Sequence, residues 1–271
     1  MRHRRRNSCV HVGGLPPDPA TSAEAAGLHR ILTYNVHRCR GGDGRLSPAR
    51  IAEVIASCQP DIVALQEVDV GRRRTGGVDQ ADEIARELGM QMHFHPAFHV
   101  LEERYGDAIL TAHPSRIVRT ANLPGLQHYP GLEPRGALWA TVDVDGRALQ
   151  VVNAHIGLLA YERKLQVQAL LGPDWTGHPD CRAPAILLGD FNAVPRSRAY
   201  RRMAERFVDA QRAAGVPRPT FPARLPVIRL DHIFVSPGIR VLRTEVIRTP
   251  LARVASDHLP LMMEFTLDDA P

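Results

Sequence analysis

The sequence predicts an α/β fold in which helices cover the faces of β-sheets. Short apolar runs typical of buried strands alternate with segments of helical periodicity. The second half of the chain repeats the order of the first half, and a polar side chain follows directly after several of the apolar runs. The 271 residues are 44% hydrophobic and 23% charged. This composition is typical of one large domain with a substantial core.

The first half contains a strand, a helix and a second strand. Residues 31–34 form an apolar run that ends on Asn35. Ser47, followed by a proline, is expected to cap a helix with one apolar face. A second apolar run, residues 61–66, ends on Glu67. This order indicates a layered α/β arrangement with polar residues at the strand ends.

A basic loop and a histidine-rich strand follow. Arg72 and Arg73 belong to a glycine-flanked basic loop, which we expect to be flexible and to lie at the active rim if Glu67 does. Beyond a helix over residues 79–88, alternation predicts a strand with His93 and His95 on one face. With His99 these are a candidate metal cluster, but no acid accompanies them, so a polar sheet face is the preferred interpretation.

The middle of the chain places further polar groups beside strands. Tyr105 and Asp107 stand ahead of an apolar strand. A loop rich in proline and glycine, residues 122–136, ends in Arg135 before the strand at residues 137–142. A tyrosine, a carboxylate and an arginine thus lie near strand ends.

The second half repeats the theme of the first. Residues 149–154 run into His155 as the first strand runs into Asn35. After a helix over residues 160–171, another apolar run leads to Asp190. Because strands that share a sheet can bring their ends to one edge, these polar residues are expected to converge. Asp, Asn and His often end strands as turn formers. Four polar residues at strand ends in this order, Asn35, Glu67, His155 and Asp190, favour a functional site instead.

The segment after the central apolar run carries an acid and an amide. Asp190 and Asn192 lie on the same side of an extended backbone. A carboxylate there can hold and polarise a water, and an amide can orient it or support a phosphoryl oxygen. This chemistry needs a cation and a general base from elsewhere.

The C-terminal part supplies the base. Asp231 stands near the start of a strand, and Asp257 and His258 open the last one. A histidine is the natural base for water near neutral pH. A carboxylate such as Asp231 can fix its tautomer and stabilise the imidazolium. Asp257 adds a further ligand or orienting carboxylate.

Six motifs in this order resemble the endonuclease/exonuclease/phosphatase superfamily over residues 28–267. The motifs are Thr33-Tyr34-Asn35-Val36-His37, Leu65-Gln66-Glu67-Val68, Asn153-Ala154-His155, Gly189-Asp190-Phe191-Asn192, Leu230-Asp231-His232-Ile233-Phe234-Val235 and Ser256-Asp257-His258-Leu259-Pro260. The resemblance implies a four-layer α/β/β/α sandwich with two packed mixed sheets and an active site at one end.

The resemblance also implies a divalent cation and phosphate contacts. Mg²⁺ or Mn²⁺ would be held chiefly by Glu67, with Asn35 and Asp257 close by or bound directly. Oxygen-rich ligation of this kind suits a hard cation. Tyr105 matches a phosphate-contacting tyrosine of parts of the family. Arg135 is either a phosphate contact or a structural ion pair, and Arg72 and Arg73 are further phosphate-binding candidates.

The remaining motif residues acquire catalytic roles by the same resemblance. Asp231 and His258 would form the base dyad that activates water for in-line attack on phosphorus. Asp190 would orient that water, while Asn192 and His155 would stabilise the pentacovalent transition state.

The resemblance implies a metal-dependent phosphoesterase and leaves the substrate open. We expect a phosphodiesterase acting on a nucleic-acid backbone or a phospholipid headgroup. The alternative is a phosphomonoesterase acting on a sugar, inositol or lipid phosphate, and a non-catalytic binding module is a remote third case. His155 matches the deoxyribonuclease, sphingomyelinase and inositol-phosphatase branches, and abasic-site repair is disfavoured. His232 and Asp107 depart from common family residues and bear on substrate preference.

Charge and composition complete the expectations. A net charge of +5 and a pI near 9.4 favour anionic partners. Residues 1–27 are expected to be a flexible basic arm and residues 28–271 the catalytic domain. Without an apolar stretch suited to a secretory signal or a membrane span, we expect a cytoplasmic monomer, with peripheral contact to nucleic acid or membrane as an option. The four cysteines show no metal or disulfide pattern and are expected to be reduced.

Overall fold

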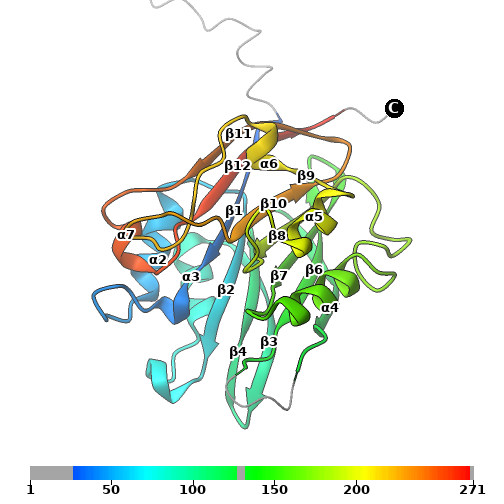
Figure 1. Cartoon of the computed structure of the whole chain (residues 1–271). Coiled ribbons are helices and arrows are strands. Elements are labelled where there is room, and N and C mark those ends of the chain that lie inside the picture. Colours follow the sequence, from blue (N-terminus) through cyan, green and yellow to red (C-terminus); the bar gives the residue numbers. More distant parts are fainter. Residues whose placement is uncertain (1–26, 127–131, 269–271) are drawn as a thin grey trace, which may run out of the picture.

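The structure is a computed structural model of the chain, and it describes residues 27–126 and 132–268. The basic arm expected at residues 1–27 therefore lies outside the described residues except for its last residue. Figure 1 shows two sheets between two groups of helices.

Each sheet has six strands. The first has the order β11-β12-β1-β2-β4-β3 and the second the order β5-β6-β7-β8-β10-β9. The first sheet consists of β1 (His29–Asn35), β2 (Ile62–Val70), β3 (Gln91–Val100), β4 (Glu103–Thr111), β11 (Ile239–Val246) and β12 (Leu261–Leu267). The second consists of β5 (Ser115–Asn122), β6 (Gly136–Val144), β7 (Arg147–His155), β8 (Ala185–Asp190), β10 (Asp231–Val235) and the short β9 (Val208–Asp209).

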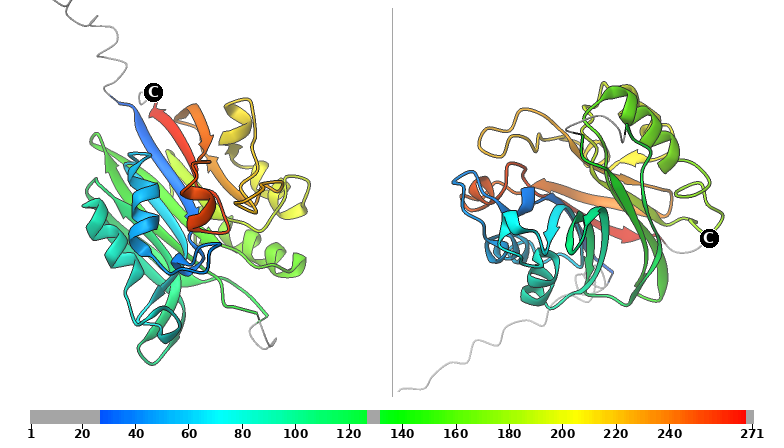
Figure 2. Two further views of the ribbon diagram at one scale, coloured as in Figure 1. Left: turned by 90° about the vertical axis from the view of Figure 1, so that its left-hand side faces the viewer. Right: turned by 90° about the horizontal axis from the view of Figure 1, so that it is seen from below.

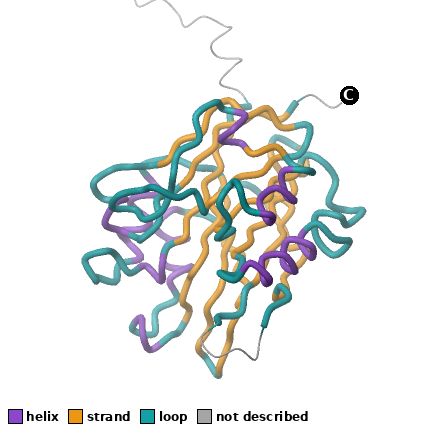
Figure 3. Tube along the Cα trace, viewed as in Figure 1, coloured by secondary structure: helices purple, strands orange, loops and turns teal. Residues whose placement is uncertain are grey.

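Helices cover the outer faces of both sheets, as Figures 2 and 3 show. Helices α2 (Pro48–Ala56) and α3 (Gln80–Leu88) lie on the first sheet, at the left of Figure 1, whereas α4 (Ala160–Leu170) and α5 (Arg198–Ala204) lie on the second. Short helices α6 (Ala210–Ala213) and α7 (Ala252–Ala255) and 3-10 turns η1 (His37–Cys39) and η2 (Arg73–Thr75) stand in connections. The predicted α/β/β/α sandwich is confirmed.

The inner strands of the second sheet, such as β8 and β10, bury both faces, which explains their continuous apolar runs. In β8, Ile186 and Leu188 pack in the core between the sheets, while Leu187 packs against the α4 and α5 side. In β6, Leu138 packs between the sheets and Trp139 packs on the helix side. The period of two therefore sets the layers.

Helix α2 forms where its sequence predicts. The Ser47 side chain accepts a hydrogen bond from the backbone N–H of Arg50, which caps the first turn. Ile51, Val54 and Ile55 are buried against the first sheet. Each such side chain contributes about 1.5–3 kcal/mol through burial.

A polar bridge joins the two sheets within their shared core. Gln66 Nε2 of β2 donates to Asn153 Oδ1 of β7 at 2.8 Å. Asn153 Nδ2 in turn lies 2.9 Å from the carbonyl oxygens of both Leu65 and Ala108. Both side chains are fully buried. Buried amides with this many partners fix the position of one sheet on the other.

The histidine-rich stretch is a strand, as predicted. In β3, His93 contacts the Ser115 hydroxyl at 2.8 Å and His95 contacts Asn122 Oδ1 at 3.2 Å. Their partners belong to β5, so these histidines join the edges of the two sheets. Neither occurs in the candidate metal-binding groups found among the described residues.

The other expectations on composition have simple outcomes. Cys39, Cys58 and Cys181 are free thiols, and Cys9 lies outside the described residues. No helix within residues 27–126 and 132–268 combines the length and apolar character needed to span a bilayer.

Candidate active site

Three neighbouring strands of the second sheet place a histidine and two aspartates in one row. The register pairs His155 of β7 with Asp190 of β8, and Asp190 with Asp231 of β10. All three residues are almost fully buried. The convergence predicted for His155 and Asp190 thus follows from strand register.

A β-bulge in the first sheet presents Glu67. The β2–β4 register shifts between Leu65 and Val68, and Glu67 has φ +59°. Such a left-handed conformation is unfavourable for residues other than glycine and is typical of functional sites. The bulge re-aims Glu67 relative to the regular alternation of the strand.

Asn35 connects the two sheets at this edge. Its Nδ2 donates to Glu67 Oε1 at 3.1 Å and to Asp190 Oδ2 at 3.0 Å, while its Oδ1 accepts the backbone N–H of His37 at 3.0 Å. One amide therefore holds two carboxylates that come from different sheets.

The predicted histidine–aspartate dyad is present. His258 Nδ1 lies 2.9 Å from Asp231 Oδ2, and His258 Nε2 lies 3.6 Å from Asp190 Oδ2. Ser256, two residues before His258, anchors the loop because its hydroxyl donates to the carbonyl oxygen of Asn35 at 2.8 Å. The ring of Phe221 packs against the imidazole, with centroids 4.8 Å apart.

The charges around this dyad alter its protonation. Burial alone would lower the pKa of His258, but the carboxylates of Asp231 and Asp190 outweigh burial and raise that pKa to about 10. Burial raises the pKa of Asp190 to about 6, although nearby His258 opposes the shift. These shifts favour an imidazolium at His258 and a carboxylate at Asp190 at neutral pH.

Arg135 fixes the tautomer of His155. Arg135 Nη1 lies 3.0 Å from His155 Nδ1, and because a guanidinium can only donate, Nδ1 must accept. Burial first, and then Arg135 and His258, lower the pKa of His155 well below its usual value. The neutral ring thus carries its proton on Nε2, which lies 3.6 Å from Asp190 Oδ2.

Asn192 stands beside this ring, at the end of the same row. Its Nδ2 donates to the carbonyl oxygen of Ile156 at 2.9 Å and lies 3.3 Å from His155 Nε2. Its backbone N–H donates to Asp190 Oδ1 at 2.9 Å. Asn192 has φ +44°, a conformation that asparagine tolerates better than most residues.

Tyr105 and Asp107 extend the site along β4. Tyr105 is buried, and its hydroxyl has no hydrogen-bond partner among the described residues. Burial raises the pKa of Asp107 well above its usual value, against the opposing effect of Arg135. Asp107 is accordingly harder to ionise than an exposed carboxyl group.

Asp257 lies at the exposed side of the site, close to His37. His37 belongs to the first sequence motif but had no predicted role. The Asp257 side chain is 42% exposed, and its Oδ1 lies 3.8 Å from His37 Nδ1. His37 follows Asn35 within the first motif, and its φ is +45°. The signal for His37 was thus present in the sequence, but its contact with Asp257 depends on the fold.

The basic loop after β2 is largely paired. Arg72 Nε lies 3.3 Å from Glu103 Oε2, and Arg74 makes a bidentate pair with Asp69 at 2.7 Å. The Arg73 side chain is 96% exposed. Arg73 Nε also lies 3.9 Å from Glu103 Oε1, but of the two loop arginines named as phosphate contacts Arg73 is the more exposed.

The donor set suits a hard divalent cation. Glu67 and Asp257 offer carboxylate oxygens and Asn35 offers an amide oxygen, and Mg²⁺ and Mn²⁺ prefer such ligands. Asp231 Oδ1, like the Tyr105 hydroxyl, is buried without a hydrogen-bond partner in the part of the chain described, which fits a site completed by a polar ligand. Asp190, Asp231 and His258 also form a group with metal-ligating atoms within 4.8 Å of one another.

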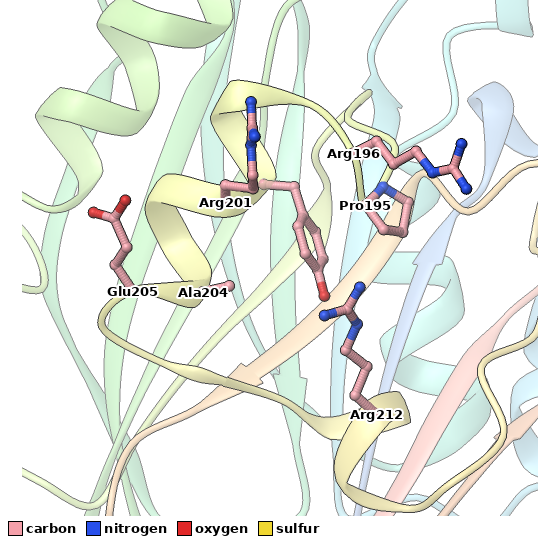
Figure 4. Close-up of a pocket in the computed structure, with 7 residues that line it drawn as sticks. Pro195, Arg196, Arg201, Ala204, Glu205 and Arg212 are labelled. Atoms are coloured by element: carbon pink, nitrogen blue, oxygen red, sulfur yellow. The ribbon is translucent and has the colours of Figure 1, made fainter.

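A separate pocket lies beside the segment that follows Asn192. Its volume is about 600 Å³. Figure 4 shows its lining side chains, from α5 and its neighbours: Pro195, Arg196, Tyr200, Arg201, Ala204, Glu205 and Arg212. Its arginines give it a basic character, and none of the row residues lines it.

Comparison with known proteins agrees with this geometry. The chain is 26% identical over 260 residues to the protein YbhP of Escherichia coli (strain K12), a match that covers 88% of this chain and 96% of that protein. The structure of an endonuclease/exonuclease/phosphatase from Beutenbergia cavernae is 26% identical, with a TM-score of 0.72, and covers 90% of this chain and 73% of that one.

A more distant structure shares the fold. The mannosyl-6-phosphatase of Bacteroides thetaiotaomicron is 19% identical, with a TM-score of 0.71 over 88% of this chain and 100% of that chain. The sequence profile described as "Endonuclease/Exonuclease/phosphatase family" matches residues 32–258. The chain therefore belongs to the endonuclease/exonuclease/phosphatase family, whose hydrolases act on phosphoester bonds.

Proposed function

We propose that this protein is a Mg²⁺- or Mn²⁺-dependent phosphodiesterase that attacks phosphorus with an activated water. The observation that carries the proposal is the row of His155, Asp190 and Asp231, with His258 bonded to Asp231. This row combines a proton acceptor, a cationic acid and neutral donors within a few ångströms. Phosphoryl transfer requires such a set to activate water and to balance charge on oxygen.

We assign the proton-accepting role to Asp190. Its carboxylate is ionised at neutral pH, and a pKa of about 6 leaves it basic enough to take a proton from water during attack. His258 holds its own proton under the same conditions. This assignment exchanges the roles expected from the sequence, in which the Asp231–His258 dyad is the base and Asp190 orients the water.

His258 then serves as a positive charge beside the reacting group. Its Nε2 lies 3.6 Å from Asp190 Oδ2, so it keeps that carboxylate ionised. Asp231 holds the imidazolium through Nδ1 at 2.9 Å. Removal of Asp231 would leave a buried cation with one carboxylate fewer.

Two neutral donors face the place where charge develops. His155 presents Nε2–H because Arg135 occupies Nδ1, and Asn192 presents its amide beside it. Preorganised donors of this kind stabilise negative charge on phosphoryl oxygens in the transition state. They require no reorganisation because both side chains are already held.

Glu67, Asp257 and Asn35 are the residues that would hold the cation. Asn35 has one lone pair of Oδ1 left beside its bond from His37, and its other bonds orient Glu67 and Asp190. When bound, the divalent ion would supply positive charge to offset that on the phosphoryl and leaving oxygens.

The diester is the preferred substrate class. Family membership and a basic chain fit a nucleic-acid backbone or a phospholipid headgroup. The alternative is a phosphomonoesterase, because a mannosyl-6-phosphatase has the same fold, and one fold supports several substrates. A non-catalytic module is disfavoured, because the assembled charges would then serve no chemistry.

The test is hydrolysis of bis-p-nitrophenyl phosphate and p-nitrophenyl phosphate with Mg²⁺, Mn²⁺ or EDTA, for the wild type and Asp190→Ala. Metal-dependent cleavage of the diester that disappears in the variant supports the proposal. Cleavage of the monoester alone favours the phosphatase. Failure of the wild type to bind either cation, measured by calorimetry, would contradict both.

A further inference from the structure

A second group of metal-binding side chains lies at the opposite end of the sandwich. His29 opens β1, Asp61 directly precedes β2, and His113 follows the end of β4. One ligand atom from each side chain lies within 4.8 Å of the other two. Three segments far apart in the sequence thus bring two imidazoles and a carboxylate together.

This group is separate from the active site. His29 and Asn35 stand at the two ends of β1, and six strand residues at about 3.3 Å each place them roughly 20 Å apart. Asp61 and Glu67 are separated in the same way along β2. A ligand bound at His29 therefore has no contact with the phosphate chemistry.

One nitrogen in the group, His113 Nε2, has no hydrogen-bond partner among the described residues. This nitrogen is buried. The His113 ring lies edge-on to that of His29, with centroids 5.9 Å apart. Buried polar atoms are nearly always paired, so this nitrogen points to a ligand.

The other two members are held by outer contacts. Asp61 Oδ2 accepts the backbone N–H of Arg30 at 2.6 Å. His29 Nε2 lies 3.0 Å from Asp145 Oδ2, in the turn between β6 and β7, and His29 is 7% exposed. Contacts of this kind fix the tautomer and the orientation of metal ligands.

We propose that His29, Asp61 and His113 hold a Zn²⁺ ion, with a water molecule as the fourth tetrahedral ligand. Two imidazoles and a carboxylate are ligands that zinc prefers, in contrast to the oxygen-rich active site. Ligand atoms around tetrahedral zinc lie about 3.3–3.5 Å apart, so binding draws the side chains closer by small rotations. The ion would join the ends of β1, β2 and β4, and Asp145 would connect it to the other sheet.

The test is metal binding by untagged, EDTA-stripped protein titrated with Co²⁺ and then Zn²⁺. Wild type should show the visible absorption bands of tetrahedral Co²⁺, and Zn²⁺ should displace them. His113→Asn should lose these bands and bind Zn²⁺ at least about 100-fold more weakly, because loss of a direct ligand costs at least as much as loss of an outer-shell partner, with Mg²⁺-supported hydrolysis unchanged. His93→Asn is the matched control, a half-buried histidine outside the group, and should behave as wild type.

Two results would overturn the proposal. One is a wild type without tetrahedral Co²⁺ bands. The other is a His113→Asn variant that keeps them, which would assign the metal to the active site or another position. Should His113→Asn fail to fold by circular dichroism, Asp61→Asn provides the same comparison.

Discussion

At the scale of single residues, the site depends on which group holds a proton. Asp190 and His258 lie 3.6 Å apart and are both buried, yet their pKa values are moved in ways that keep both charged at neutral pH. The carboxylate is ready to accept a proton, while the imidazolium is not. The pH dependence of hydrolysis should therefore reveal the assignment.

We expect kcat/KM to rise with pH as Asp190 ionises, near pH 6, and to fall as His258 loses its proton, near pH 10. A bound metal ion adds positive charge, so it moves both the rise and the fall of kcat/KM to lower pH. The rise still precedes the fall. Asp231→Asn removes a carboxylate that raises the pKa of both His258 and Asp190, so the fall and the rise of the profile should both move to lower pH. Asp82→Asn, on the exposed face of α3, should leave the profile unchanged.

The opposite assignment gives a different profile. If His258 is the base, activity rises only as its proton leaves, so the wild-type profile has no fall near pH 10 and Asp231→Asn moves only the rise. Initial rates measured from pH 5 to pH 10.5 in mixed buffers at constant ionic strength distinguish the two cases.

Arg135 should act through His155. Arg135→Met frees His155 Nδ1, so the proton can move away from Nε2, and kcat should fall roughly 10- to 100-fold with a smaller change in KM. Nitrogen NMR of His155 should show the Nε2–H tautomer in wild type and a mixture in the variant. Arg119→Met, which removes an arginine packed on Trp175, is the control. An unchanged tautomer would contradict the role.

At the scale of elements, the close contact between β7 and β8 requires a glycine. Gly189 has φ +142°, and a Cβ there would lie 1.9 Å from the carbonyl oxygen of Ala154. Gly189→Ala should cost about 3 kcal/mol or more of unfolding free energy, because both the strain and the clash must be relieved. The change also displaces Asp190, so activity should fall.

Gly146 allows the cost of backbone strain to be measured without a steric clash. Gly146 has φ +78° but open space around its added Cβ, so Gly146→Ala should cost only about 1–2 kcal/mol. Urea unfolding of both variants gives the comparison. Equal costs at the two positions would show that the Ala154 contact is not limiting.

Elements also differ in how well the sequence predicts them. Central strands such as β1, β2, β7 and β8 were predicted, because their apolar runs and polar ends are local signals. The strands β5 and β11 were not, because they are edge strands with exposed and arginine-bearing faces. The edge strand β3 was predicted because its histidines alternate with apolar residues, so the sequence predicts an edge strand only where it keeps such a pattern.

The site shows the same limit. The polar residues at the strand ends were identified, since each interrupts an apolar run. The Glu67 bulge and the Arg135–His155 contact were not, because they arise from strand register and from segments that meet only in the fold. Pattern thus identifies the participants, while tertiary structure decides their charge states.

At the scale of the whole molecule, the docking of the two sheets depends on Asn153. Its amide satisfies the carbonyl oxygens of Leu65 and Ala108 beside the bulge. Asn153→Leu leaves both buried without this donor, so we expect a loss of about 2–5 kcal/mol of unfolding free energy. Asn122→Leu, at the sheet edge, should cost less. If urea unfolding gives comparable losses for Asn153→Leu and Asn122→Leu, the Asn153 hydrogen bonds do not contribute more to stability than those at the sheet edge.

The Asn35 amide has a consequence beyond its two hydrogen bonds. It touches one carboxylate from each half of the sandwich, so it measures how the halves are aligned. A slip of either half by a fraction of a residue would separate Glu67 from Asp190 while most apolar contacts survive. Catalysis should therefore disappear before the protein melts, and turnover becomes a sensitive gauge of alignment.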